Sequence, residues 1–209
     1  MSTQSPTPTD RLRVILGSSS KFRAAILNAA ALSFTTVTHP IDEKNAVPGR
    51  TATSSPSETA LAVARAKAAA LLANRAPDIA NALLITADQV VSWHGSVREK
   101  PVDAAQCREY LAGYATAPAE THSALVVVNT VTGKTVEGID VARQHFKPIP
   151  TEVIDALIAK GDIMYCSGGF MIDDPIMFPY LGPREGDEDS IIGMPLKLLT
   201  RLLAEAENV

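Results

Sequence analysis

Hydroxyl and cationic side chains gather at one break in the chain, where they could bind phosphate. An apolar run at residues 12–16 is typical of a strand, and apolar residues spaced along 22–32 predict a helix with Ser20 as its N-cap. The first turn of a helix presents free N–H groups and a partial positive charge, both of which favour an anion. Ser18 could add a hydroxyl and Arg23 a two-armed guanidinium. The alternative is an ordinary capped helix with exposed cations.

Acidic side chains beside apolar segments could hold a metal ion. Asp42 and Glu43 follow a strand-like stretch at 33–38, and Asp88 follows an apolar strand at 82–87, which residues 89–93 could continue. Carboxylates at neighbouring strand ends meet at one edge of a sheet, where they can bind Mg²⁺ together. A charge directly after a buried strand is costly unless it serves a purpose, which favours Asp88. Asp42 and Glu43 could equally belong to a solvated loop.

Two lysines could neutralise a bound phosphate. Lys67 lies on or beside the apolar face of an alanine-rich helix predicted at 58–73. It could point into an acidic or phosphate site, or it could extend its ammonium group to water. Lys100 precedes Pro101, which holds the lysine backbone extended and so fixes its direction.

The elements that must position these groups alternate between strand and helix periods. Further strands are predicted at 122–130 and 135–146, joined by a hairpin signal at 131–134, so the sheet cannot be purely parallel. The polar stretches 42–57 and 168–189 predict loops, and the second is long enough to be functional. Further helices are predicted at 104–112, 150–160 and 194–207. We therefore expect an α/β fold in which helices flank a mixed β-sheet.

Composition narrows the class of protein. The chain has 209 residues, of which 46% are apolar and 20% charged, enough to bury a core in one domain over residues 11–209. The net charge of −4 gives no sign of binding to nucleic acid or a membrane surface. The two cysteines, Cys107 and Cys166, can build neither a disulfide framework nor a four-cysteine zinc site, and the four histidines lack ligand spacing.

No targeting segment is evident. The longest uninterrupted apolar run in a strand-like stretch, at 124–128, falls far short of the roughly 20 residues that a membrane helix needs. Residues 1–9 are rich in serine, threonine and proline, and no basic residue precedes Arg11, so they resemble neither a signal peptide nor a transit peptide. We expect residues 1–10 to be a disordered tail and the protein to be cytoplasmic.

Seven short motifs occur in the order and spacing typical of the Maf family of nucleoside triphosphate pyrophosphatases. They are LGSSSKFR at 16–23 with IL at 26–27, IDE at 41–43, AK at 66–67, ADQVV at 87–91, KP at 100–101, CSGG at 166–169 and IIGMPL at 191–196. The chain resembles the family over about residues 12–203.

This resemblance implies two α/β lobes around a central cleft, as in the related inosine-triphosphate pyrophosphatases. It implies cleavage of a nucleoside triphosphate to monophosphate and pyrophosphate with Mg²⁺ or Mn²⁺, and suggests a homodimer. The positions that match the family's functional residues are Ser18, Arg23, Glu43, Lys67, Asp88 and Lys100. Asp88 falls where the family places its proposed general base, and Glu43 and Asp88 are the expected metal ligands.

Three further positions resemble the family's 7-methyl-GTP-preferring group. Phe22 stands where that group has Trp, Gln89 matches its Gln, and Asp173 stands for an acid in the later loop. Because N7-methylation makes guanine cationic, an aromatic face and a carboxylate would both favour it. Phe22 could instead be a core residue, and Asp173 and Asp174 could belong to an ordinary turn. Because this loop diverges from the family pattern, the motif does not decide which of the two aspartates matches the family's acid.

The chain departs from the family pattern at Lys21, which replaces a proline, and at Glu99, which replaces a glycine. Two other functions stay open. One is a pyrophosphatase that prefers dTTP and UTP; that family group typically has Arg at Phe22 and Thr at Gln89. The other is a nucleotide-binding regulator of cell division without turnover, which would not need Asp88.

Overall fold

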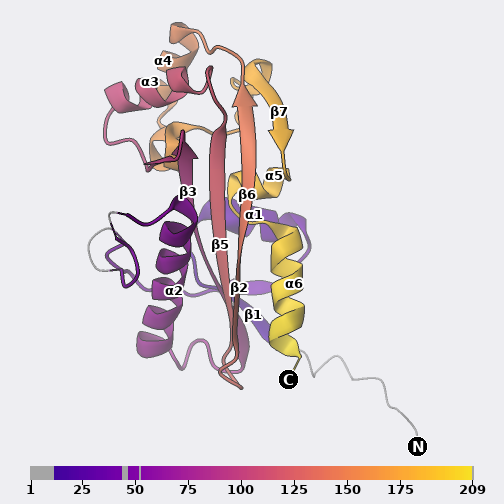
Figure 1. Ribbon diagram of the computed structural model, residues 1–209. Coiled ribbons are helices and arrows are strands. Elements are labelled where there is room, and N and C mark those ends of the chain that lie inside the picture. Colours follow the sequence, from indigo (N-terminus) through magenta and orange to yellow (C-terminus); the bar gives the residue numbers. More distant parts are fainter. Residues whose placement is uncertain (1–11, 44–46, 52, 209) are drawn as a thin grey trace, which may run out of the picture.

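The protein folds around one long mixed sheet (Figure 1). A computed structural model describes residues 12–43, 47–51 and 53–208. Within these residues seven strands pair in the order β2-β1-β3-β5-β6-β7, and β4 is attached to β3. The strands are β1 (Arg13–Leu16), β2 (Phe34–Thr36), β3 (Ala82–Trp93), β4 (Ser96–Arg98), β5 (Ala119–Asn129), β6 (Thr135–Phe146) and β7 (Leu181–Glu185).

Strand direction agrees with the mixed sheet expected from the sequence. β1 pairs in parallel with both β2 and β3, whereas the pairs β3–β5, β5–β6 and β6–β7 are antiparallel. The predicted hairpin is confirmed, because β5 and β6 pair along almost their whole length. The α/β fold class is confirmed as well.

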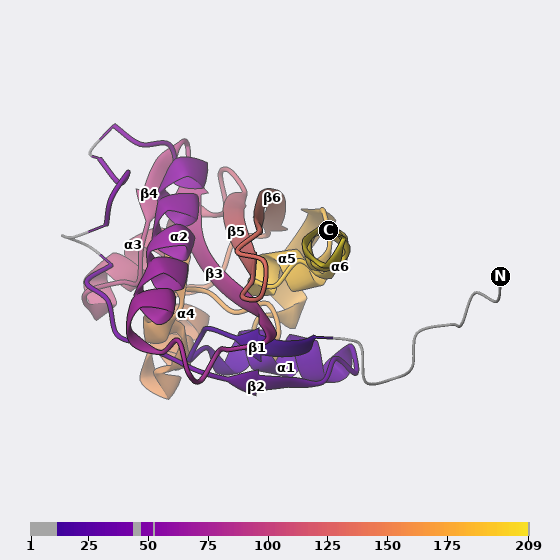
Figure 2. The same ribbon diagram turned by 90° about the horizontal axis from the view of Figure 1, so that it is seen from below.

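Helices cover both faces of the sheet, as Figure 2 shows from below. They are α1 (Lys21–Ala29), α2 (Pro56–Asn74), α3 (Ala104–Gly113), α4 (Thr151–Lys160), α5 (Glu188–Ile192) and α6 (Leu196–Glu207). Side chains alternate along β3, so Leu84 packs with α2 while Leu83 and Ile85 pack with α1 and α6. A third core cluster joins α3 and α4 at the opposite end of the long strands from β1 and β2 (Figure 1).

The structure decides one open point about local structure and corrects one prediction. β3 continues past Asp88 to Trp93, the continuation over 89–93 that the sequence left open, because β5 pairs with it along this stretch and places Ala124 opposite Asp88. The stretch 168–189 is not one loop, since it contains short 3₁₀ turns, β7 and the start of α5. β7 escapes recognition because it contains Gly182 and Pro183, which a strand accepts at the edge of a sheet.

Helix α2 illustrates how the local sequence sets an element. It starts two residues before the predicted helix, at Pro56, because Ser55 and Glu58 form a reciprocal capping box. Its alanines then let the helix lie close to the sheet, with Ala60, Ala64 and Ala68 in the core. Lys67 is held in place by this packing.

Two further expectations concern the N-terminal tail and membrane-spanning segments. The tail at residues 1–10 lies outside the described residues. Within the described residues, no helix combines the length and apolar character needed to cross a membrane.

Candidate active site

Ten of the residues that the sequence analysis named line a single cleft of about 740 Å³, whereas Asp42 and Asp174 are not among its lining residues. The ten come from the turn before α1, from α1 itself, from the segment after β2, from α2, from β3, and from the segments after β4 and the later 3₁₀ turns. The residues are Ser18, Ser20, Phe22, Arg23, Glu43, Lys67, Asp88, Gln89, Lys100 and Asp173. Segments far apart in the sequence therefore meet at one place.

The turn between β1 and α1 is held tightly against the sheet. Gly17 N donates to Ile85 O at 2.7 Å, and a Cβ on Gly17 would approach Leu71 Cδ1 to 2.6 Å, so only glycine fits without a shift. Ser20 is the N-cap of α1, as predicted, and its hydroxyl accepts from Arg23 N. Ser18 Oγ accepts from Ser20 N at 3.2 Å, so both hydroxyls shape the turn.

Arg23 ties this turn to the neighbouring elements. Its Nη1 donates to Ala87 O at 3.1 Å and to Ser18 Oγ at 3.2 Å, and its Nε donates to Gly193 O at 3.0 Å. Burial lowers the pKa of the guanidinium, while Asp88 and Glu43 oppose the shift. These bonds use Nε and Nη1 but not Nη2. Arg23 can therefore both hold the turn in place and bring positive charge to the cleft.

A buried ion pair lies at the centre of the cleft. Lys67 Nζ donates to Asp88 Oδ1 at 2.8 Å and lies 3.0 Å from Glu43 Oε1. Asp88 is only 9% exposed, and burial raises its pKa, while Lys67 and Arg23 work against that increase. The lysine is thus aimed at the two acids, which decides against the alternative in which it extends to water.

The donor set fits a hard divalent cation. Glu43 and Asp88 supply carboxylate oxygens, and Mg²⁺ is typically held by one or two carboxylates together with phosphate oxygens of the substrate. In the part of the chain that the structure describes, no three His, Cys, Asp or Glu side chains cluster in a way that could hold a metal. The described residues therefore offer two carboxylates, and water molecules or phosphate oxygens of the substrate could fill the other coordination positions.

The two adjacent aspartates of the later loop have different surroundings. Asp173 is exposed and lines the cleft. Asp174 is 2% exposed; its Oδ2 accepts from Lys160 Nζ at 2.6 Å and its Oδ1 from Ile176 N at 3.0 Å. Burial alone would raise the pKa of Asp174, but these hydrogen bonds outweigh burial and leave the pKa below its usual value. Of the two, Asp173 is the residue that can meet a ligand.

Comparison with known proteins agrees with this arrangement. The family model for Maf-like proteins matches residues 13–206. The chain belongs to the Maf family. The resemblance seen in the sequence motifs is thereby confirmed.

Among Maf relatives, the chain is 41% identical to a 7-methyl-GTP pyrophosphatase of Dictyostelium discoideum over 93% of this chain and 98% of that protein. It is 31% identical to a nucleoside triphosphate pyrophosphatase of Streptomyces coelicolor, over 95% of this chain and 93% of the relative. It is 32% identical to a 7-methyl-GTP pyrophosphatase of Burkholderia thailandensis, over 93% and 87% of the two chains.

Two of the Maf-like positions have structural contacts that the motifs did not reveal. Gln89 Nε2 lies within 3.0 to 3.1 Å of Ser123 Oγ and of the main-chain oxygens of Ser190 and Ile191, so its amide holds α5 against β3. Lys21 Nζ lies 5.2 Å from the centre of the Phe22 ring. The Phe22 ring can therefore interact with a cation, while Gln89 acts first as a brace.

Sequence reasoning missed two residues of the cleft. Arg50 Nη1 donates to Glu43 O at 2.6 Å, and Arg50 Nη2 lies 2.5 Å from Glu99 Oε1. Tyr165, 76% exposed, stands at the edge of the same cleft. The one sequence signal for Arg50 was Glu99, which departs from the Maf pattern. An additional acid in a cleft is expected to pair with a cation, and that cation is Arg50. Tyr165 gave no signal beyond its place next to the CSGG motif.

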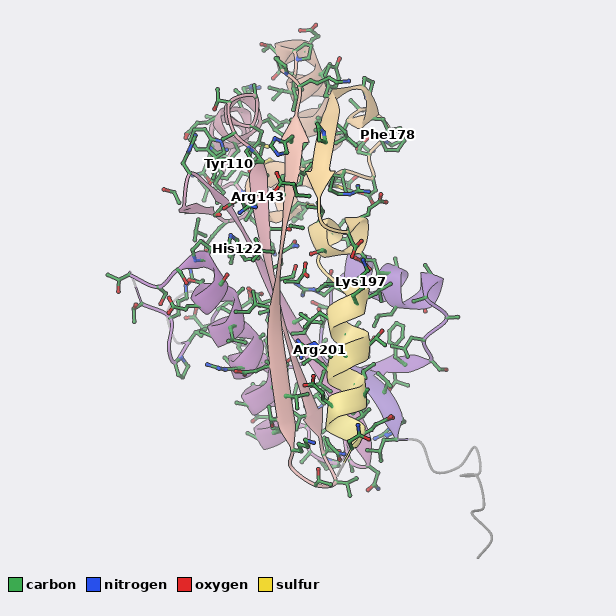
Figure 3. The ribbon with its side chains drawn as sticks, turned by 45° about the vertical axis from the view of Figure 1, so that its right-hand side comes forward. Tyr110, His122, Arg143, Phe178, Lys197 and Arg201 are labelled. Carbon is green, nitrogen blue, oxygen red and sulfur yellow. The ribbon has the colours of Figure 1, made fainter. Side chains whose placement is uncertain are left out.

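The buried histidine does not belong to the cleft. His122 on β5 lies beside Arg143 on the neighbouring strand β6 (Figure 3). Its Nδ1 is 2.9 Å from Ser57 Oγ and its Nε2 is 3.0 Å from Ser92 Oγ, and burial lowers its pKa. Both ring nitrogens are thus engaged in holding α2 to the sheet.

Proposed function

We propose that this protein hydrolyses a nucleoside triphosphate, 7-methyl-GTP or another modified nucleotide, to the monophosphate and pyrophosphate. Two sets of facts support this. Maf relatives that match more than nine-tenths of the chain carry the names 7-methyl-GTP pyrophosphatase and nucleoside triphosphate pyrophosphatase. The single observation that carries the proposal is the buried Asp88, paired with Lys67 beside Glu43, in the same cleft as the start of α1.

The triphosphate lies along the turn that precedes α1. Free N–H groups in the first turn of the helix and the positive charge of Arg23 favour an anion there. Ser18 and Ser20 shape this turn and can turn their hydroxyls toward a phosphate oxygen. Lys67, and Lys100 on the edge of the cleft, neutralise further charge. The protein first contributes to the rate by binding and orienting the charged triphosphate.

Asp88 acts on the attacking water. Its carboxylate accepts a proton as the water oxygen forms a bond to the α-phosphorus, and the bond from that phosphorus to the bridging oxygen breaks. Pyrophosphate leaves with the bridging oxygen, and the proton stays on Asp88 until solvent removes it. Burial raises the pKa of Asp88, which makes it a stronger base than an exposed aspartate.

Mg²⁺ or Mn²⁺ held by Glu43 and Asp88 would neutralise charge on the phosphate oxygens in the transition state. Lys67 contacts both carboxylates and so keeps two acids close together without strong repulsion. The same ammonium group can also neutralise charge on the phosphate.

The nucleobase lies near Phe22 and Asp173, which line the same cleft. N7-methylguanine carries a positive charge, which an aromatic face attracts and a carboxylate neutralises. Asp173 can also accept hydrogen bonds from the N1–H and N2–H₂ edge of guanine. A pyrimidine is uncharged and gains neither the attraction of a cation to the ring nor the neutralisation by the carboxylate, so the cationic purine is the favoured nucleobase.

The test is the release of pyrophosphate from 7-methyl-GTP, GTP, dTTP and UTP, each with Mg²⁺ and with Mn²⁺. We expect the highest kcat/KM with 7-methyl-GTP. A preference for UTP or dTTP would contradict the assignment of the base. Nucleotide binding without any turnover would contradict the enzymatic proposal and favour a regulator.

A further inference from the structure

Glu43 stands in a part of the chain without regular structure, so contacts from other segments must hold its carboxylate. It lies between β2 and α2. Its side chain Oε1 is 3.0 Å from Lys67 Nζ, and its main-chain oxygen accepts a hydrogen bond from Arg50 Nη1 at 2.6 Å. Two cations thus hold one residue, Lys67 at the carboxylate and Arg50 at the backbone.

Arg50 has a second anchor on another segment. Its Nη2 lies 2.5 Å from Glu99 Oε1, in the segment that follows β4 and leads directly into Lys100. The Arg50 side chain is only 22% exposed, so water weakens this ion pair less than it weakens a fully exposed one. A planar guanidinium can hold two acceptors in a fixed relation, which an ammonium cannot do. Arg50 therefore joins the Glu43 segment to the Lys100 segment.

The Arg50–Glu99 pair also forms part of a wall. Arg50, Glu99 and Lys100 line both the candidate active site and a neighbouring cavity of about 510 Å³. An arginine in this wall could bind the triphosphate directly, or it could act by holding Glu43. The contacts favour the second role, because each terminal nitrogen is already engaged by an oxygen of the protein.

We propose that Arg50 is a positioning residue, which holds Glu43 where its carboxylate can bind the divalent metal. The proposal rests on the proposed function in one respect, namely that Glu43 is a metal ligand. Residues that orient a metal ligand typically contribute a factor of 10 to 100 to metal affinity. No motif of the family pointed to Arg50, whose role emerges only when the segments are brought together in space.

The test is the affinity for Mn²⁺ alone, measured by the loss of the free-ion signal in electron paramagnetic resonance. We expect Arg50→Ala to weaken Mn²⁺ binding roughly 10-fold or more. Arg50→Lys keeps the charge but reaches only one acceptor, so its effect should be smaller. Arg108→Ala is the matched control, because it removes an exposed arginine–aspartate pair, with Asp155, away from the cleft. It should leave Mn²⁺ affinity unchanged.

The direction of the effect separates positioning from simple electrostatics. Removing a positive charge near a metal site should tighten the binding of a cation if Arg50 acts only through its charge. Unchanged or tighter Mn²⁺ binding in Arg50→Ala would therefore overturn the proposal. The same holds if Glu43→Gln leaves Mn²⁺ affinity unchanged. If Arg50→Ala does not fold by circular dichroism, Arg50→Lys and Glu99→Gln decide, and both must weaken Mn²⁺ binding.

Turnover provides the second readout. A positioning role predicts that Arg50→Lys lowers kcat and leaves the nucleotide KM within about twofold of wild type. A raised KM with unchanged Mn²⁺ affinity would instead make Arg50 a phosphate-binding residue. Because Mn²⁺ binding involves no nucleotide, that measurement decides the role of Arg50 even if the wild-type protein releases no pyrophosphate.

Discussion

At the scale of single residues, the cleft is organised by a lysine placed between two acids. A lone aspartate as buried as Asp88 would be strongly disfavoured in its charged form, and Lys67 at 2.8 Å makes that form accessible. Arg23 adds a second positive charge that acts on the same carboxylate. Two opposing effects therefore set the pKa of Asp88: burial raises it, and the two cations limit the rise.

The pH dependence of turnover should report this balance. Because its pKa is raised, the Asp88 carboxylate gains its proton at a higher pH than an ordinary aspartate does. As the pH is lowered, kcat/KM should therefore begin to fall at a pH above the usual aspartate pKa of about 3.9. Lys67→Met removes a cation that lowers this pKa, so the acid limb should move to still higher pH. A limb that stays in place after this substitution would show that Lys67 does not act on Asp88.

The two neighbouring aspartates should respond differently to the same change. Asp173→Asn should lower kcat/KM for 7-methyl-GTP more than for GTP, because the neutral amide no longer neutralises the charged base. Asp174→Asn should instead lower the melting temperature, since it weakens the bond between the buried Asp174 carboxylate and the exposed Lys160 ammonium. Equal losses with all substrates in Asp173→Asn would remove that residue from the base site.

The Asp174 pair also carries a pH dependence of its own. Its pKa is below the usual value in the folded protein, so its stabilisation is present above the unfolded aspartate pKa and is lost as pH falls through the folded pKa. The difference in melting temperature between wild type and Asp174→Asn should therefore shrink below about pH 4. A difference that is constant between pH 7 and pH 3 would contradict this origin.

At the scale of elements, the turn from β1 to α1 was predicted from the sequence together with its N-cap. Its serines, its glycine and the helix period are local signals, and local signals specify a capped helix. What the sequence did not reveal is that Arg23 braces the turn by donating to Ala87 O and Gly193 O. Those acceptors lie 64 and 170 residues away along the chain, and no local pattern encodes such a contact.

Two cations of this element can be compared directly. Arg23→Ala should raise KM for triphosphates and also lower the melting temperature, because it removes both a positive charge and the bonds that hold the turn. Lys21→Ala should do neither to a similar extent, since the Lys21 side chain is 75% exposed and pairs only loosely with Asp162 at 3.8 Å. Equal effects of the two substitutions on KM would mean that Lys21 also binds the phosphates.

At the scale of the whole molecule, the mixed sheet and the meeting of the motifs in one cleft followed from the sequence. The strand hairpin and the alternating helices are periodic patterns, and periodicity predicts elements well. The sequence left the continuation of β3 past Asp88 open and did not predict β7, because pairing with a partner strand overrides local propensity. Arg50 was missed for the same reason: its partners are distant in the sequence, and only the assembled fold joins them.

The most direct test of the account is pyrophosphate release from 7-methyl-GTP by wild type and by Asp88→Asn. The substitution is nearly isosteric and leaves an acceptor for Lys67, so circular dichroism should show an intact fold. Loss of a general base predicts a fall in kcat by about two orders of magnitude or more. A correctly folded Asp88→Asn protein with near-wild-type kcat would contradict the account, because Asp88 would then have no part in the reaction.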